Sequence, residues 1–161
     1  MESRAKLFGH PIHQMLIVFP LGLLATALAF DAIQLVTANG FWSVIAYWMI
    51  AAGIVTGLLA APFGLIDWLA IPSGTRAKRV GAIHGGGNVV VLFLYLTSWL
   101  MRTGDPSTPE VPALVLAFAG GAMAMVTGWL GGELVDRLAI GVDDGAHVNA
   151  PSSLSTRRAR D

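Results

Sequence analysis

Five ionisable side chains lie at the same end of the apolar runs that dominate this chain: His10, His13, Asp67, His84 and Glu133. Ionisable groups are rare inside membrane-spanning segments and are usually functional there. At about 1.5 Å per residue of helix, each lies within a turn or two of the boundary of its run. Imidazoles bind transition metals, and a carboxylate can accept the N–H of a ligating imidazole and fix its tautomer. We therefore expect one polar site to which every helix contributes.

The spacing of these residues favours shared helix faces. His10 and His13 are three residues apart in "HPIHQ", and His84 and Asn88 are four apart in "AIHGGGN". Residues three or four apart are neighbours on a helix surface. His10 precedes Pro11, however, and a residue before proline is biased away from helix. Each histidine alone is explained as well by a side chain that reaches water at the membrane surface, but the set at one depth favours a site.

Haem binding is the first chemistry that this set could support. His13 and His84 lie on different helices and would supply axial imidazoles, about 4 Å apart across the iron if each metal–nitrogen bond is about 2 Å. A helix surface without side chains would accommodate the flat ring. The expected contacts of a b-type haem are His13, His84, His10, Asn88, Gly128 and Gly132. Such a site would serve electron transfer in the membrane.

Two alternatives remain open. In one, a divalent metal is bound, and mixed imidazole and carboxylate ligands suit zinc, iron or manganese. Its expected ligands are His10, His13, His84, Asp67 and Glu133. In the other there is no cofactor, and the polar groups lock the bundle of a structural protein or gate a proton or ion path in a small transporter. Asp31 is the obvious polar group across the membrane, and we interpret it as structural, capping a helix or bonding a tryptophan N–H.

The composition identifies the chain as an integral membrane protein. Of its 161 residues, 55% are hydrophobic and only 12% are charged, about half the share in soluble domains. The net charge is zero, which gives no indication of nucleic-acid binding, and the chain has no cysteine for a disulfide or a thiolate ligand. Four runs are long enough to cross a bilayer, which takes about 20 residues. We predict an all-α bundle with membrane helices at about 11–36, 44–70, 82–100 and 112–135.

Basic residues predict the orientation. They collect in the first ten residues, in the loop between the second and third spans, and near the carboxyl terminus. By the positive-inside rule all three lie in the cytoplasm, so both termini are inside. We divide the chain into a cytoplasmic amino terminus (1–10), a four-helix membrane domain (11–136) and a polar, disordered cytoplasmic tail (137–161). Prolines 20 and 62 lie inside spans and should each kink a helix.

Small residues recur every four positions on two of the spans. The second span has Gly53, Gly57 and Ala61, and the fourth has Gly120, Ala124, Gly128 and Gly132. Such stripes let helices approach closely in lipid. They leave room for a homo-oligomer, and the fourth-span stripe is the surface on which a flat cofactor would lie.

The sequence also resembles a bacterial membrane-protein family catalogued as a domain of unknown function. The motifs are "GHPIHQMLIVFPLG", "FGLIDW", "AIHGGGN" and "TGWLGGELV", and the likeness runs from about residue 9 to 141. The resemblance implies four membrane helices, a bacterial inner-membrane location and no established activity. It singles out His10, His13, Asp31, Asp67, His84, Asn88, Gly131, Gly132 and Glu133. Some relatives carry a Rieske-type iron–sulfur domain, which favours electron transfer, and we expect the electron-transfer partner of this chain to be a separate molecule.

Overall fold

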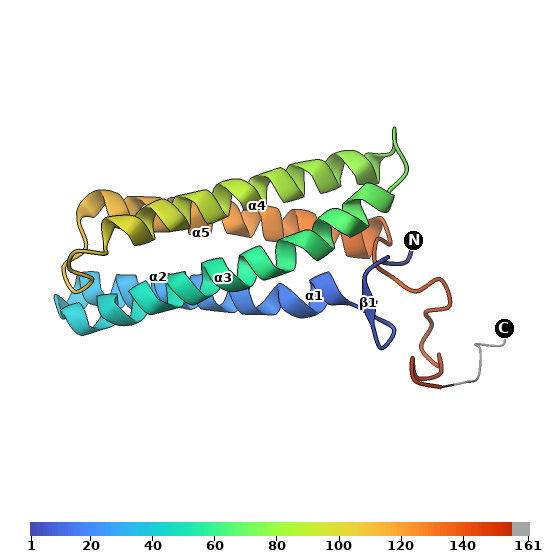
Figure 1. Ribbon diagram of the computed structural model, residues 1–161, viewed down its shortest axis with the longest axis horizontal. Helices are drawn as coiled ribbons and strands as arrows, with labels where there is room; N and C mark the ends of the chain where they lie inside the picture. Colours follow the sequence, from blue (N-terminus) through green and yellow to red (C-terminus); the bar gives the residue numbers. More distant parts are fainter. Residues whose placement is uncertain (156–161) are drawn as a thin grey trace.

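The computed structural model, which describes residues 1–155, is a bundle of four long helical segments (Figure 1). The helices are α1 (Ile12–Leu16) and α2 (Val18–Thr37), α3 (Gly40–Ala70), α4 (Arg76–Met101), and α5 (Val111–Gly132) with its π-helical continuation η1 (Glu133–Arg137). Each segment is long and apolar enough to cross a membrane. The prediction of an all-α four-helix membrane bundle is therefore confirmed.

Polar caps place two helix starts earlier than the apolar runs suggested. The side chain of Asn39 accepts a hydrogen bond from the N–H of Phe41, so α3 begins at Gly40 rather than near residue 44. The hydroxyl of Thr75 accepts from the N–H of Lys78, so α4 begins at Arg76 rather than near residue 82. Capping side chains satisfy amides that lack an intrahelical partner. The basic residues expected in a loop thus form the first turn of α4.

The two internal prolines have different effects. Pro20 deprives the carbonyl of Leu16 of its partner, and the first segment is interrupted there, with Ile17 between α1 and α2. Pro62 lies inside α3 without ending it. The break after Leu16 makes α1 a separate short helix, and this helix carries His13.

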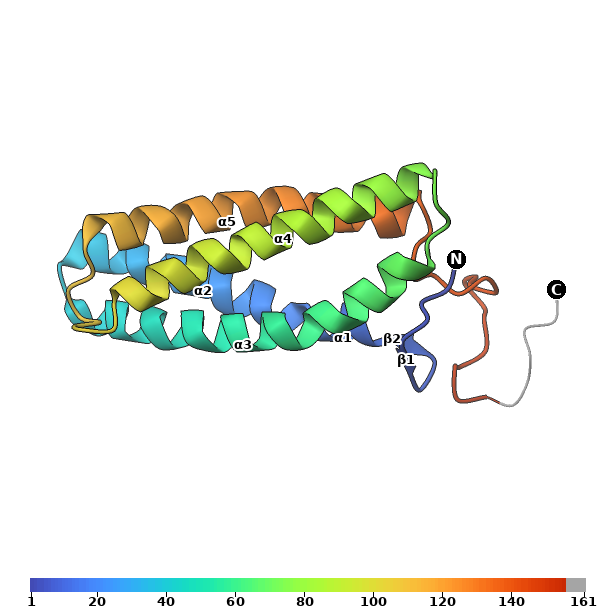
Figure 2. The same ribbon diagram turned by 45° about the horizontal axis from the view of Figure 1, so that its top comes forward.

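The bundle consists of two helical hairpins. The first half-bundle is α1 to α3, in which α2 packs against α3, and the second is α4, α5 and η1, in which α4 packs against α5. A core of small, branched and aromatic side chains joins them: Leu24, Ala27, Ala46, Ile50, Ile54, Val91, Tyr95 and Ala117. Helices α1 and α4 both begin at the same end of the bundle, on the right in Figure 2. We call this end the histidine end, and the opposite end the Asp31 end.

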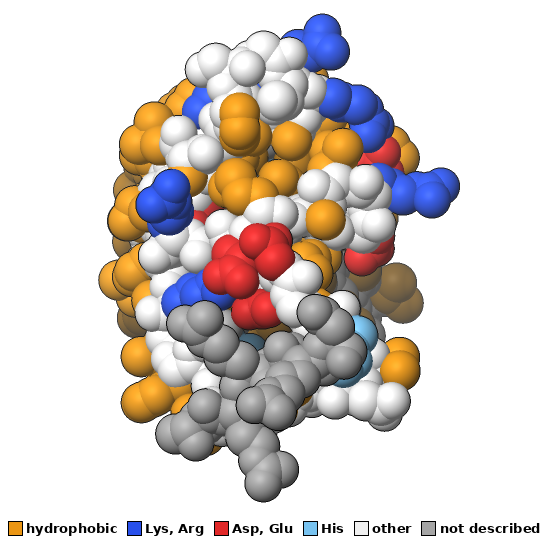
Figure 3. All heavy atoms as spheres, turned by 90° about the vertical axis from the view of Figure 1, so that its right-hand side faces the viewer, with side chains coloured by type: hydrophobic (Ala, Val, Ile, Leu, Met, Phe, Trp, Pro, Cys, Tyr) orange, Lys and Arg blue, Asp and Glu red, His pale blue; other side chains and the backbone are white. Residues whose placement is uncertain are grey.

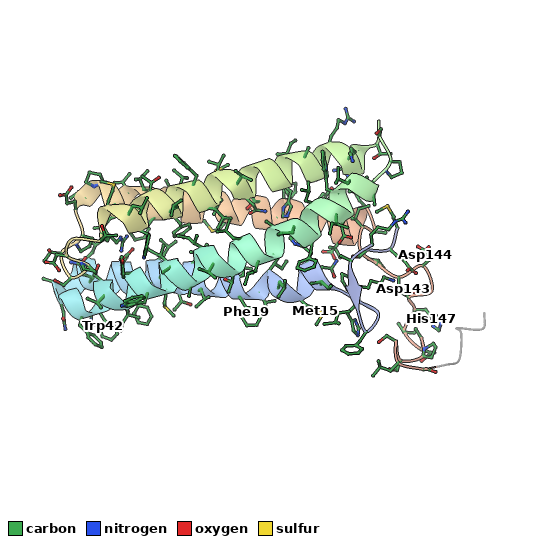
Figure 4. The ribbon with its side chains drawn as sticks, viewed as in Figure 1. Met15, Phe19, Trp42, Asp143, Asp144 and His147 are labelled. Carbon is green, nitrogen blue, oxygen red and sulfur yellow. The ribbon has the colours of Figure 1, made fainter. Side chains whose placement is uncertain are left out.

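Large apolar side chains cover the outside of the bundle. Val36, Trp48 and Phe93 are all more than half exposed, and Met15 and Phe19 project from the first half-bundle (Figure 4). A surface of this kind is suited to lipid tails rather than to water. The association with a bilayer that we predicted from composition agrees with this surface.

Both ends of the described chain meet at the histidine end. Strands β1 (Lys6–Leu7) and β2 (His10–Pro11) pair as a small antiparallel hairpin. The amino group of Met1 donates to the carbonyl of Ala139, and the N–H of Gly141 donates to the carbonyl of Met1. Seen end-on, acidic side chains gather near the middle of this face, with lysine and arginine toward the rim (Figure 3).

Among the acidic residues at this end, Glu2 and Asp143 pair with Lys6, and Asp144 pairs with the amino terminus. The hydrogen bond from Lys6 to Glu2 raises the pKa of Lys6. Part of the tail that we expected to be disordered therefore contacts the amino-terminal segment, while residues 156–161 lie outside the described residues.

Candidate functional site

His13 is held inside the first half-bundle by a backbone carbonyl. Its Nδ1 lies 3.0 Å from the carbonyl oxygen of Ala60 in α3. The imidazole lies against Gly64, one turn further along α3, where a Cβ would come within 2.8 Å of Cε1 of the ring. Contacts that short do not occur without displacement, so the ring has this position because residue 64 has no side chain.

His84 has the same arrangement in the second half-bundle. Its Nδ1 lies 2.8 Å from the carbonyl oxygen of Thr127 in α5. One turn beyond Thr127 is Gly131, where a Cβ would lie 3.1 Å from Cε1 of the imidazole. In both half-bundles, a histidine near the start of the first segment thus bonds a carbonyl of the second and packs on the glycine four residues later.

The likeness between the half-bundles extends to the other end. Asp31 and Arg102 are 71 residues apart, the same separation as His13 and His84, and they form an ion pair. Both segments run in the same direction, from the histidine end to the Asp31 end (Figure 1). The two half-bundles therefore repeat the same arrangement of histidine, carbonyl and glycine, and the two histidines occupy equivalent positions in it.

The carbonyl bonds determine the tautomer of each imidazole. A carbonyl oxygen only accepts, so Nδ1 carries the proton in both rings and Nε2 has the lone pair. Nε2 of His84 lies 3.2 Å from the amide nitrogen of Asn88, and the Thr127 hydroxyl donates to the amide oxygen of Asn88 at 2.9 Å. Within residues 1–155, Nε2 of His13 has no hydrogen-bond partner.

Polar bonds join the half-bundles at both ends. At the histidine end the indole N–H of Trp68 in α3 donates to the carbonyl of Lys78 in α4, and the ammonium group of Lys78 donates to the carbonyl of Trp68. The Tyr95 hydroxyl donates to the carbonyl of Leu24, and Arg102 donates to Asp31. Both bonds join α4 to α2 in the part of the bundle nearer the Asp31 end. At the level of His13 and His84, each imidazole is bonded within its own half-bundle.

The carboxylates expected beside the histidines have other partners. Asp67 accepts from the hydroxyl of Ser3 and from the backbone N–H groups of Arg4 and Ala5, and so anchors the amino-terminal segment to α3. Glu133 pairs with Arg76 at 2.6 Å. Neither bonds an imidazole, so the expectation that they fix the histidine tautomers is wrong and backbone carbonyls have that role.

His10 is separate from His13. It lies in β2 with its side chain exposed, and its Nε2 is 3.3 Å from the hydroxyl of Ser153. The expectation that the two share a helix face is wrong, because Pro11 starts the helix after His10. His147 lies beyond the end of the bundle (Figure 4).

No three histidine or acidic residues within residues 1–155 form a group that could hold a metal ion. Of the five expected ligands, His10, Asp67 and Glu133 are engaged elsewhere. The proposed metal set remains a prediction to which this arrangement gives no support.

The fourth-span stripe divides between two directions. Gly120 packs on the ring of Tyr95, whereas a Cβ on Gly128 or Gly132 would meet no atom within 4 Å. A haem contact with Gly128 and Gly132 thus stays a prediction, on a surface that is open in this structure.

The ion-pair partner of Asp31 was not expected. We anticipated that Asp31 would cap a helix or bond a tryptophan N–H. Arg102 instead donates to both carboxylate oxygens of Asp31, at 2.7 and 2.8 Å, and both side chains are fully buried. The common separation of 71 residues was the signal in the sequence that connects this pair with His13 and His84. No such signal in the sequence pointed to Thr127, because this residue bonds His84 through its backbone carbonyl, a group that every residue has.

No curated protein and no solved structure matches the chain. A family model described as "Predicted membrane protein (DUF2231)" matches residues 9–144, which include all four membrane segments and both carbonyl-anchored histidines. The chain therefore belongs to this family of membrane proteins of unknown function.

Proposed function

We propose that the protein binds a b-type haem between its half-bundles, with His13 and His84 as the axial ligands, and serves in membrane electron transfer. The observation that carries this proposal is the matched pair of imidazoles, each anchored through Nδ1 to a carbonyl of its own half-bundle. When bound, the haem would supply a one-electron redox centre, and electrons would pass to or from a separate partner.

The tautomer of both imidazoles supports ligation. Histidines that bind metals almost always donate their other ring N–H to a carbonyl, carboxylate or water. Ala60 and Thr127 accept that proton here, which leaves Nε2 of each ring as the ligating atom. Each ring packs directly on a glycine, which keeps the imidazole in its orientation. The fold therefore already provides the ordering of both ligands, and haem binding would not have to supply that free energy.

The position between the half-bundles also supports the proposal. The histidines begin parallel segments at equivalent positions, so both arrive at the same depth. The polar bonds that join α2 to α4 lie nearer the other end. A flat group between His13 and His84 would therefore break neither of these bonds between α2 and α4.

If Nε2 of His84 binds the haem iron, the side chain of Asn88 has to move away from it. Its amide nitrogen lies 3.2 Å from Nε2 of His84, at the long end of the range for such bonds. A neutral hydrogen bond contributes about 0.5–1.5 kcal/mol net, which a metal–imidazole bond readily exceeds. The hydroxyl of Thr127 would keep hold of the amide oxygen as the other end of the side chain turns.

One observation favours a second function. His84, Asn88 and Thr127 form a closed ring of hydrogen bonds in which both nitrogens of the imidazole are satisfied. A satisfied network of this kind rigidifies a bundle without any cofactor. The second candidate is thus a cofactor-free polar lock that holds α4 to α5.

The distribution of charge supports a bacterial inner-membrane location with the histidine end in the cytoplasm. Arg4, Lys6, Arg76, Lys78 and Arg79 all lie at that end. Arg102 is buried against Asp31, so the two loops at the other end have no basic residue. An excess of basic residues marks cytoplasmic loops.

The test is a visible absorption spectrum of the detergent-purified protein, expressed with ample haem supply, before and after reduction with dithionite. We expect a Soret band, with sharp α and β bands on reduction. His13→Ala and His84→Ala should each abolish the reduced spectrum while the protein stays assembled. His10→Ala and His147→Ala are matched controls that should leave it unchanged. A featureless spectrum of the unaltered protein would reject haem and leave the polar lock.

A further inference from the structure

We propose that the Asp31 end of the bundle contains bound water, held between α2, α3 and α4 beside the Asp31–Arg102 pair. Among residues 1–155, four buried side-chain atoms have no hydrogen-bond partner: Gln34 Oε1, Ser43 Oγ, Trp99 Nε1 and Arg102 Nε. All four belong to residues at this end of the bundle. The inference does not depend on haem at the histidine end.

Contacts between the helices bring these residues to one level. Gln34 follows Asp31 by one turn of α2, and Trp99 precedes Arg102 by one turn of α4. Ser43 precedes Tyr47 by one turn of α3, and the ring of Tyr47 stacks on Trp99 with 5.3 Å between centroids and 18° between planes.

The chemistry of the four atoms matches water. Arg102 Nε and Trp99 Nε1 are donors, Gln34 Oε1 is an acceptor, and the Ser43 hydroxyl is both. Asp31 already balances the charge of Arg102, so a neutral molecule suits the site better than an anion. Buried waters typically make about three hydrogen bonds to polar groups that would otherwise be unpaired.

The depth of the site allows water to reach it. Gln34 and Trp99 lie within four residues of the ends of α2 and α4, Ser43 is the fourth residue of α3, and Arg102 caps α4. Each is thus about one turn, or about 5.4 Å, from the end of its helix. Water here would also reduce the cost of burying an ion pair, because each unsatisfied polar group adds to that cost.

The sign of a stability change separates bound water from unpaired groups. If Ser43 and Trp99 hold water, Ser43→Ala and Trp99→Phe remove a hydrogen bond and should each lower Tm by about 2–4 °C. If the two groups are unpaired, the same changes remove a buried polar atom without a partner and should raise Tm or leave it unchanged. Phenylalanine retains the aromatic stack on Tyr47.

Ser98→Ala is the matched control, because the hydroxyl of Ser98 donates to the carbonyl of Ala113 at 2.7 Å and is just as buried as that of Ser43. This variant should lose stability in either case. A second measurement is the NMR cross-peak between the Trp99 indole proton and water in the full-length protein. We expect this cross-peak in the unaltered protein and its weakening in Ser43→Ala. Raised or unchanged stability in both variants, or no water cross-peak at Trp99, would overturn the proposal.

Discussion

Asp31 and Arg102 face each other across the half-bundles as a bidentate ion pair with both side chains fully buried. Each follows the carbonyl-anchored histidine of its own half-bundle by 18 residues, so the same position carries opposite charges in the two half-bundles. Ser98 adds a hydroxyl oxygen 3.2 Å from the same guanidinium group. The pair joins α2 to α4 at the end opposite the histidines.

Removing one member of this pair should be costly. Asp31→Asn or Arg102→Met leaves a buried polar or charged group without its partner, and we expect a loss of about 3–5 kcal/mol in the free energy of unfolding. Because the two positions are equivalent, the charge-swapped double variant Asp31→Arg/Arg102→Asp should recover part of the loss. Denaturant titration in detergent measures all three. A double variant no more stable than the worse single variant would contradict a direct pairing.

The glycines behind the imidazoles should tolerate no side chain. Gly64→Ala places a Cβ 2.8 Å from the ring of His13, and Gly131→Ala places one 3.1 Å from the ring of His84. We expect both to displace the imidazole and to lower haem content, with the larger effect at Gly64.

Gly128→Ala and Gly132→Ala are controls for these variants, since a Cβ there meets nothing within 4 Å. Alanine should stabilise the helix by about 1 kcal/mol. The same controls test whether a haem lies against the fourth-span stripe, because in that case they too would lower haem content. Haem per protein, from the reduced spectrum, distinguishes these outcomes.

Asp67 should control the order of the amino-terminal segment. Asp67→Ala removes hydrogen bonds to a carboxylate, each worth about 1.5–3 kcal/mol, and local opening should rise about tenfold or more since each 1.4 kcal/mol is a factor of ten. Trypsin cleaves after Arg4 and Lys6, so its rate at these sites reports the opening. Glu133→Gln is the control, as Glu133 pairs with Arg76 and not with this segment. Equal cleavage of both variants would mean that Asp67 does not hold the segment.

The orientation can be measured with reporters. A reporter fused after Asp161 should be active only when its activity requires the cytoplasm, because the basic residues lie at the histidine end. A second fusion in the loop between α4 and α5, after Ser107, should give the opposite result. Activity of the terminal fusion on the outer side would reverse the topology and move the histidines to the other face of the membrane.

The sequence by itself determined the architecture. Four apolar runs of sufficient length leave the chain no alternative to membrane helices, since every backbone group in lipid must be paired within its own segment. The break beside Pro20 followed from the missing amide of proline. Their depth also singled out His13 and His84 as candidate site residues, because ionisable groups at that level are costly unless they have a use.

Only the tertiary structure decided which groups are partners. The hydrophobic pattern gives the depth of a residue in the membrane but not the direction in which its side chain points around the bundle. Asp67 and Glu133 were therefore expected beside the histidines, although they bond Ser3 and Arg76. Backbone carbonyls such as that of Thr127 carry no side-chain signal. In the sequence, Arg102 has the pattern of a loop residue. Only the packing of α2 against α4 brings it to Asp31, whose charge offsets the cost of its burial.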